Sequence, residues 1–413
     1  MTDTTLDALT RDELATLLRE WLLHGHLQDR VGIPLLYEHG VEREAAEQVA
    51  IDEWMAASPV YTVRTQELLG FRRESVETIL KNLQIDIGAP PQYMDFRLKV
   101  IDDAHGEFWL DHCGALMDVE PMGDEWVHGM CHTIEDPTFD ATALATSRHA
   151  LVRPVHRPPR APADRMPHCH WTVTIDPAHP TPSPHPNQAL VERSLAARAP
   201  VVPPATVDEP DGLVDYAGPL DPDLRFEDFS RETLLAILPE VARQSHLLMR
   251  GYLLSVTQRV SPEVAAGAGP RVLTGVAPVT AGRLAKAFGI TPSGAADVAR
   301  ILALHPSFQP PGYVDTRIEV VDGRTVRLAF LPAAIFDEGD DHTWLAGLGG
   351  AADRAIDALA RGIDARAAAT PVEPRGDERF AYELTLDPDA PRRREEPETA
   401  LARFSGAATF VFR

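Results

Sequence analysis

Cysteine and basic side chains are scarce in this chain of 413 residues, which has three cysteines and 39 Lys and Arg residues against 62 Asp and Glu residues. The formal net charge of -23 repels nucleic acid and anionic lipid, so neither is an expected partner. Three cysteines are too few, and odd in number, for a disulfide framework. In a reducing compartment such thiols stay free to bind a metal or to react.

Long apolar runs are also missing. No stretch approaches the roughly 18 to 20 residues that cross a bilayer, and the polar, acidic start of the chain lacks the basic and apolar regions of a secretory signal. We therefore expect a cytoplasmic protein without a membrane partner. A hydrophobic content of 44% with 24% charged residues suffices for a buried core, and the length favours two lobes.

The sequence contains an internal repeat. The segment Pro90–Arg97 reappears as Pro310–Arg317, 220 residues later, and seven of the thirteen positions in the window from residue 90 to 102 are identical. The same offset aligns the helical pattern of Arg11–Arg30 with Arg231–Arg250, and both begin with Thr or Ser, then Arg and an acid, as capped helices do. Such self-similarity predicts two copies of one fold.

The repeat also sets the expected domains. We place the first copy at residues 10–200, a Pro- and Asp-rich linker at 201–229, and the second copy at 230–413. In copy one, periodicity predicts helices near Arg11–Arg30, Glu42–Met55, Glu74–Leu83 and after Pro137, and strands at Met94–Ile101, Glu107–Leu116 and Trp171–Ile175. Helices with antiparallel strands indicate an α+β fold, arranged as a pseudo-symmetric, dimer-like chain.

A cluster of cysteines and histidines lies in the first copy alone. Ten of the sixteen histidines fall between His105 and His185, and all three cysteines lie in the same region. Three short segments hold the side chains with the character of metal ligands: His112 and Cys113, His128 and Cys131 with His132, and His168, Cys169 and His170.

The second copy serves as an internal control. At the corresponding places it has Pro332-Ala333, about Gly349-Gly350, and Arg379-Phe380-Ala381, so every candidate ligand is lost. A cysteine that served only to fill the core would be retained or exchanged for Val or Ser in at least one place. Joint loss therefore favours a joint role for the three cysteines, in metal binding or in catalysis.

Several cofactors fit three thiolates. They could hold an iron-sulfur cluster with one iron open, or a single zinc or iron ion whose fourth ligand is a histidine or water. Either centre would leave a coordination position for substrate. A nucleophilic cysteine activated by a neighbouring imidazole is the metal-free alternative.

Further candidates surround the cluster. Glu120, the Glu135-Asp136 pair and His132 could transfer protons, and Arg153 and Arg157 could bind a substrate carboxylate. In contrast, His26 and Arg30 recur as His246 and Arg250 in the copy that lost the cysteines. They are therefore interpreted as scaffold residues.

With these residues in place, copy one resembles the L-2-amino-thiazoline-4-carboxylic acid hydrolase family over residues 60 to 176. The family has one cysteine after a strand, matched by Cys113, a second shortly before an acid, matched by Cys131 and Asp136, and a third before a strand, matched by Cys169. An Arg-containing segment precedes the third cysteine, where Arg153 or Arg157 stands. The resemblance implies C–N or C–S bond chemistry on a small, amino-acid-like substrate.

We therefore expect a hydrolase- or lyase-like metalloenzyme whose site lies in copy one, beside a second copy that is a catalytically inactive structural partner. The alternatives are a metal-binding or sensor protein without turnover and a metal-free cysteine hydrolase.

Overall fold

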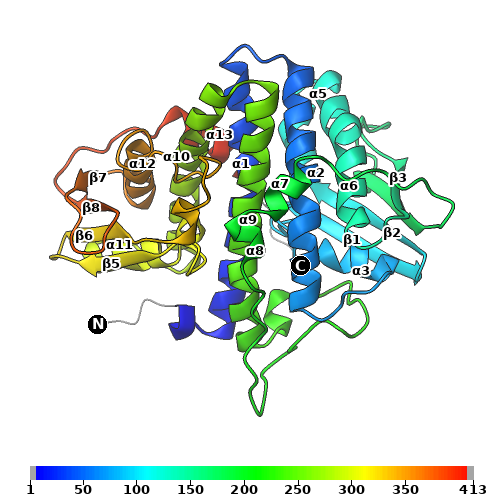
Figure 1. The fold of residues 1–413 in the computed structure, drawn as a ribbon, viewed down its shortest axis with the longest axis horizontal. Coiled ribbons are helices and arrows are strands. Elements are labelled where there is room, and N and C mark those ends of the chain that lie inside the picture. Colours follow the sequence, from blue (N-terminus) through cyan, green and yellow to red (C-terminus); the bar gives the residue numbers. More distant parts are fainter. Residues whose placement is uncertain (1–5, 407–413) are drawn as a thin grey trace.

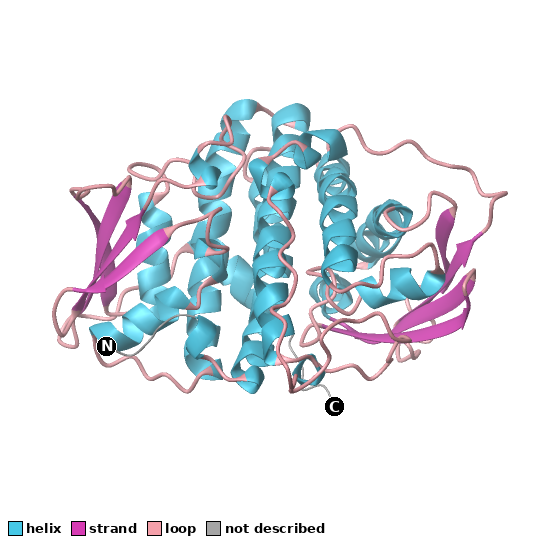
Figure 2. Cartoon of the chain, turned by 60° about the horizontal axis from the view of Figure 1, so that its bottom comes forward, coloured by secondary structure: helices cyan, strands magenta, loops and turns pink. Residues whose placement is uncertain are grey.

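The computed structural model describes residues 6–406, which form two similar halves around a shared layer of long helices (Figure 1). Figure 2 shows these helices in the middle of the molecule and one sheet toward each end. The α+β class and the two similar halves are thereby confirmed. The end of the predicted second copy, residues 407–413, lies outside the described part, and the linker boundaries stay a prediction.

The two halves have the same order of elements. The first half contains α1 (Arg11–Tyr37), α2 (Arg43–Leu68), α3 (Val76–Asn82), β1 (Met94–Asp102), β2 (His105–Cys113), α4 (Gly114–Val119), η2 (Glu120–Met122), α5 (Asp124–His128), η3 (Gly129–Ile134), α6 (Glu135–Leu144), β3 (Ala150–His156) and β4 (Cys169–Ile175). The second half contains α9 (Arg231–Arg259), α10 (Pro262–Ala287), α11 (Ala295–Ala303), η5 (Pro306–Phe308), β5 (Thr316–Val320), β6 (Thr325–Phe330), η6 (Ala334–Phe336), α12 (Asp353–Ile363), β7 (Ala367–Val372), β8 (Phe380–Leu386) and α13 (Pro397–Gly406).

Both sheets are antiparallel and share one topology. The strand orders are β1-β2-β4-β3 and β5-β6-β8-β7. The registers also correspond, because Leu110 pairs with Cys169 in the first sheet and Phe330 pairs with Phe380 in the second. The helix starts agree as well: the hydroxyl of Thr10 caps α1 and that of Ser230 caps α9, as the repeated Thr/Ser-Arg-acid pattern predicts.

Some local predictions are wrong at their boundaries. α1 and α2 continue well past the expected ends at Arg30 and Met55 because their later turns are buried between the halves. The strand expected to reach Leu116 ends at Cys113, whose thiol caps α4. No strand is predicted at β3, which forms the outer edge of the first sheet. The short, half-exposed edge has a weak alternating pattern, so periodicity alone did not indicate it.

The helices of the halves pack on each other along the centre of the molecule. α1 lies against α9 and α10, and α2 lies against α9. Gly32 lets α1 approach closely, and the Tyr252 hydroxyl donates a hydrogen bond of 2.7 Å to the Gly32 carbonyl oxygen. A buried ion pair of 2.7 Å joins Arg64 of α2 to Glu240 of α9. The interface is therefore part of the core.

The segment that ends each half lies on the other half. After β4 the chain forms α7 (Gln188–Glu192) and α8 (Leu195–Arg198), and α8 contacts η6 and α9 of the second half. α13, which follows β8, packs on α1 and α4 of the first half. Each closing segment thus bridges the two halves, since α13 also packs on α10 and α7 on α2 of their own halves.

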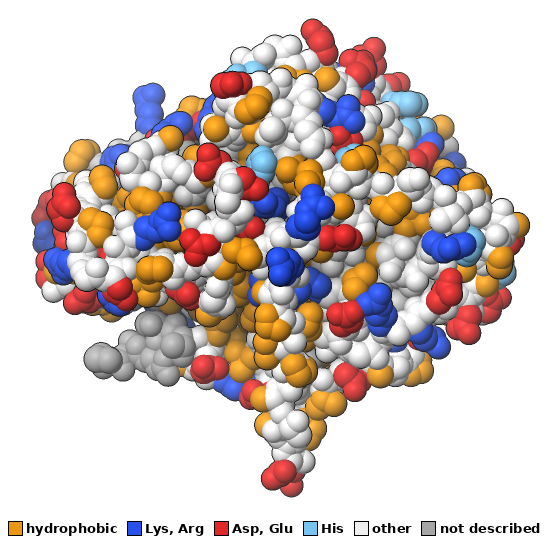
Figure 3. Space-filling view, in the orientation of Figure 1, with side chains coloured by type: hydrophobic (Ala, Val, Ile, Leu, Met, Phe, Trp, Pro, Cys, Tyr) orange, Lys and Arg blue, Asp and Glu red, His pale blue; other side chains and the backbone are white. Residues whose placement is uncertain are grey.

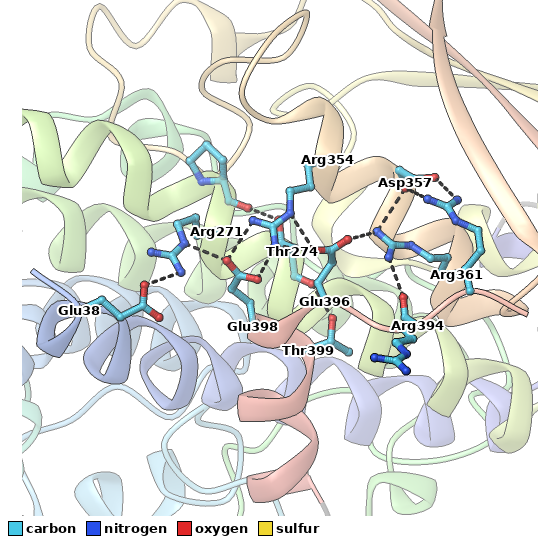
Figure 4. A network of polar contacts seen from close by, with 12 residues as sticks. Glu38, Arg271, Thr274, Arg354, Asp357, Arg361, Arg394, Glu396, Glu398 and Thr399 are labelled. Carbon is cyan, nitrogen blue, oxygen red and sulfur yellow. Dashed lines mark hydrogen bonds and ion pairs between the residues drawn. The ribbon is translucent and has the colours of Figure 1, made fainter.

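An ion-pair network fixes the start of α13 (Figure 4). The carboxylate of Glu398 is almost fully buried and accepts hydrogen bonds from Arg271 at 2.9 Å and from Arg354 at 2.8 Å. Arg271 also pairs with Glu38 of the first half at 2.8 Å. These contacts hold α13 against both halves.

The predicted linker runs over the surface as a projecting loop before η4 (Phe226–Asp228). Figure 3 shows mixed charges over this face and apolar side chains on the projection, where Val202 and Val214 are exposed. Beyond its tip the loop is held to the first half, because the Lys81 ammonium donates a hydrogen bond of 2.9 Å to the Tyr216 carbonyl oxygen. None of the helices between residues 6 and 406 combines the length and apolarity needed to cross a bilayer.

Candidate active site

A cavity of about 700 Å³ opens in the first half, enclosed by α1, α2, the start of the sheet, α4, α6 and α13. Its wall is mostly apolar, with contributions from Trp54, Phe96, Trp126 and Phe139, and Ala400 and Leu401 of α13 complete it. A smaller set of polar side chains also lines it: His26, Asp29, Arg30, Tyr37, Glu47, Asp86, Cys113, Asp118, Glu135, Thr138 and Thr142. An apolar cavity with a few convergent polar groups is the usual form of a small-molecule site.

One polar group of the cavity is a cluster on α1. The Tyr93 hydroxyl donates a hydrogen bond to the Asp118 carboxylate, and the His26 ring lies 4.7 Å from the Tyr93 ring. Nε of Arg30 is 3.9 Å from Asp118 Oδ2 and 3.5 Å from Asp29 Oδ1. One turn of α1, the residue before β1 and helix α4 therefore bring a cation, two carboxylates, a phenol and an imidazole together.

Burial decides which members of this cluster are charged. Burial and the neighbouring Arg30 lower the pKa of His26 to about 3, so its imidazole is neutral. Burial opposes the charge of Arg30 as well, but Tyr93, Asp29 and Asp118 outweigh it and raise its pKa above the ordinary range. Arg30 is therefore a fixed buried cation. Burial raises the pKa of Asp29, which weakens the negative charge beside it.

A thiol and a carboxyl form the second polar group. Cys113 ends β2, and its Sγ accepts a hydrogen bond of 3.4 Å from the Leu116 amide at the start of α4. Burial, and then the charge of Glu135, raise the pKa of Cys113 to about 12. Burial also raises the pKa of Glu135 to about 8, and its Oε2 makes no hydrogen bond within the described residues. At neutral pH both groups are mainly protonated.

The three cysteines converge on Glu135 although they come from three segments. Cys131 lies in η3, a π-helical turn, and Cys169 begins β4. Burial, followed by the charges of Glu135 and Cys113, raises the pKa of both thiols well above the ordinary value. All three thiols are buried and free.

The thiols do not form a ready metal site. Within residues 6–406, no three side chains among His, Cys, Asp and Glu are grouped so that they could hold a metal ion. The described residues therefore show no preformed site for a zinc ion or an iron-sulfur cluster, and the predicted cofactor stays a prediction.

The predicted histidine ligands lie in pairs outside the cavity wall. The rings of His112 and His168 are 5.3 Å apart, and those of His128 and His132 are stacked at 4.3 Å. Burial lowers the pKa of His168 to about 4. His170 lies 3.5 Å from the Glu107 carboxylate on the sheet. These contacts are structural, and they do not bring the histidines to the three thiols.

The predicted proton-transfer and substrate-binding residues are engaged in ion pairs away from the cavity. Arg157 pairs with Asp136, and Arg153 pairs with Asp140 of α6 at 2.8 Å. Glu120 accepts two hydrogen bonds from Arg160, of 3.0 and 3.1 Å. His132 is hydrogen-bonded to the Pro158 carbonyl oxygen at 2.7 Å. In this arrangement these side chains hold the loop after β3 to α6 and η2.

The cavity residues missing from the sequence-based site are chiefly His26, Arg30 and Asp118. The recurrence of His26 and Arg30 in both halves indicated a scaffold role, and Asp118 belonged to no predicted site. The structure places all three side chains in the cavity wall. The signal that could have found them is the recurrence of His26, Arg30 and an acid at one offset, with Glu338 in the place of Asp118.

The second half lacks the chemical groups of the first. Ala333 stands where the first half has Cys113, and Phe380 begins β8 where Cys169 begins β4. The acid Asp357 binds the Ala369 amide as Asp140 binds the Val152 amide, and this correspondence places Ala352 at the position of Glu135. The buried Trp344 ring packs against His246 at 4.6 Å.

No protein family, no curated protein and no solved structure matches the chain. The resemblance to the thiazoline-carboxylate hydrolase family accordingly stays a prediction, as do the activity and the substrate.

Proposed function

We propose that the first half is a small-molecule hydrolase that cleaves a C–N or C–S bond, with Cys113 as the nucleophile and Glu135 as the group that moves the proton. The observation that carries the proposal is the presence of a thiol and a carboxyl together in the wall of a mostly apolar cavity, where the charge of Glu135 acts on Cys113. Both groups are absent from the second half, whose fold is otherwise the same.

The chemistry follows from the two side chains. The Glu135 carboxylate accepts the thiol proton of Cys113 while the sulfur bonds to the electrophilic carbon of the substrate. The departing nitrogen or sulfur then takes that proton from Glu135, which leaves a covalent thioester-like intermediate. Water, with Glu135 again as the base, releases the product and restores the thiol.

The role of Glu135 as a base predicts how the rate of hydrolysis depends on pH. Burial raises the pKa of Glu135 to about 8, and only the ionised carboxylate accepts the thiol proton. The rate should therefore rise through this pH and then level off. If Glu135 acted only as an acid, the rate would fall through the same range, so the sign of the profile identifies its role.

The test is a panel of small amides, thioesters and thiazolines with wild-type protein and three variants. Cys113→Ala and Glu135→Gln should each lower hydrolysis by a factor of about 100 or more. Glu125→Gln is the matched control, because that carboxylate is exposed, and its rate should equal the wild type. Hydrolysis that survives Cys113→Ala would refute the nucleophile, and a panel without turnover would refute the hydrolase.

A metal centre is the second candidate, because all three buried thiols feel the charge of the same carboxyl, Glu135, although the described residues hold no preformed group of three ligands. Cys113, Cys131 and Cys169 would be its ligands. Metal and sulfide content of anaerobically purified protein, measured for the wild type and for Cys113→Ala, tests it directly. One metal equivalent that is lost in the variant would support this reading, and a metal-free wild type would refute it.

A further inference from the structure

Arg30 is a cation whose side chain is 11% exposed and whose hydrogen bonds are incomplete. Within the described residues its guanidinium makes only the two long ion pairs, of 3.5 Å to Asp29 and 3.9 Å to Asp118. Its Nε is buried without a hydrogen bond, although the side chain lines the cavity. A guanidinium has five N–H donors in one plane, and burial makes unused donors costly.

The second half shows the same cluster with one more member. His246, Arg250, Tyr313 and Glu338 stand 220 residues after His26, Arg30, Tyr93 and Asp118. The contacts correspond too: the Tyr313 hydroxyl donates to Glu338 at 2.9 Å, and Arg250 lies 3.7 Å from Glu338. The His246 ring lies 4.9 Å from the Tyr313 ring. The cluster is therefore a repeated unit.

The extra member is Asp340, whose carboxylate Arg250 binds with both terminal nitrogens. Nη1 is 3.1 Å from Oδ1, and Nη2 donates to Oδ2. Such a two-point contact is the strongest geometry between Arg and a planar oxyanion. In the second half the two terminal nitrogens are thus bound by a carboxylate of the chain itself, while Nε makes no hydrogen bond within the described residues, as in Arg30.

In the first half, the carboxylate at the equivalent position is bound by another arginine. Glu120, 220 residues before Asp340, accepts its hydrogen bonds from Arg160, and its side chain is 43% exposed. Arg30 therefore lacks the carboxylate partner that Arg250 has. Arg30 lines a cavity, whereas in the second half the Trp344 ring packs beside His246.

We infer that Arg30 is the anchoring residue for the carboxylate of a small organic acid, which takes the place that the Asp340 carboxylate occupies beside Arg250. The inference rests on the proposed function, because it assigns the substrate class of the same cavity. The ligand is a monocarboxylic acid with an apolar body, since the rest of the wall is mainly apolar. Asp29 and Asp118 keep Arg30 in place and limit the site to one acid group.

The test uses an unreactive acid and its neutral amide, 3-phenylpropionate and 3-phenylpropanamide, in calorimetric titrations of the whole protein. The wild type should bind the acid at least 10-fold more tightly than the amide. Arg30→Gln should lose that preference, and Arg30→Lys should keep part of it, because the charge remains and the planar fork is lost. Arg165→Gln, in the loop before β4, is the matched control and should bind as the wild type does.

Two further outcomes keep the inference open to refutation. If Arg30→Gln fails to fold, the acid-to-amide preference of the wild type decides the matter by itself. Equal binding of acid and amide by the wild type, or unchanged acid binding by folded Arg30→Gln, would overturn the assignment.

The second half offers an independent readout. Asp340→Ala should lower the melting temperature, and acetate should restore part of the loss by filling the vacated place on Arg250, whereas acetamide should not. Equal effects of acetate and acetamide would overturn the proposed equivalence of the two sites. Binding of the acid without turnover of any substrate would refute the proposed hydrolase activity but not the carboxylate site at Arg30. Turnover that depends on Cys113, without a preference for acids, would refute only the carboxylate site at Arg30.

Discussion

Replacing Glu135 by glutamine should stabilise the protein at neutral pH and leave its stability unchanged near pH 4.5. The Oε2 atom of the carboxyl is buried, and burial raises the pKa of the group from the ordinary 4.5 to about 8. Between these two pH values the folded state keeps the proton and the unfolded state loses it. The unfolded state therefore binds fewer protons, and stability falls as the pH rises.

The magnitude follows from the width of that window. Each pH unit is worth about 1.4 kcal/mol, so the wild type loses roughly 3 kcal/mol between pH 4.5 and pH 7 on account of this one group. The loss ends once the pH passes the folded pKa. Glutamine has nearly the shape of the protonated acid and does not titrate, so Glu135→Gln removes the loss.

The measurement is urea unfolding of wild type and Glu135→Gln at pH 5 and pH 7.5, with Glu125→Gln as the exposed control. The free energy of unfolding of the variant should exceed that of the wild type by much more at pH 7.5 than at pH 5. A difference that is the same at both pH values would show that Glu135 is not held neutral by burial, and the proposed pH profile of the reaction would lose its basis.

Three further predictions concern packing and access. Gly362→Ala should cost about 1–3 kcal/mol of stability, because its Cβ would lie 2.3 Å from the Pro278 carbonyl oxygen, whereas Gly267→Ala in α10 has open space and should be neutral or stabilising in the same thermal melts. Glu398→Ala should loosen α13 and raise the fluorescence of an apolar dye in the cavity, since Arg271 and Arg354 lose their shared carboxylate; unchanged fluorescence would count against α13 as a cavity wall. At pH 8 a disulfide reagent should label the native protein far more slowly than the urea-unfolded protein, since burial raises the pKa of all three thiols; rapid labelling of the native protein would contradict that burial.

The repeat could be predicted because a helix cap, a Pro-Pro-x-Tyr turn and a strand pair each constrain particular residues in both copies. The antiparallel sheets follow from the hairpin around Gly106 and from the alternation in Trp171–Ile175. The contacts of α8 and α13 with the opposite half could not be predicted, because short helices do not specify which apolar surface they cover.

The site was predicted in part. The loss of Cys113 from the second half directed the prediction to the first half, where Cys113 and Glu135 line the cavity. Arg153 and Arg157, predicted to bind a substrate carboxylate, pair with acids of α6 instead, and a sequence does not show such partners. Arg30 was overlooked because its presence in both copies was equated with a scaffold role, although its partner differs between them.

Because α13 contributes to the cavity wall, the cavity of the first half is lined by residues of both halves. A chain cut after residue 229 would keep Cys113, Glu135 and Arg30 but would lose Ala400 and Leu401, and the apolar wall would face water. The second half, which has no cysteine, thus supplies part of the cavity wall of the first half. The second half therefore takes part in the site of the first, although its own counterparts of Cys113 and Glu135 are Ala333 and Ala352.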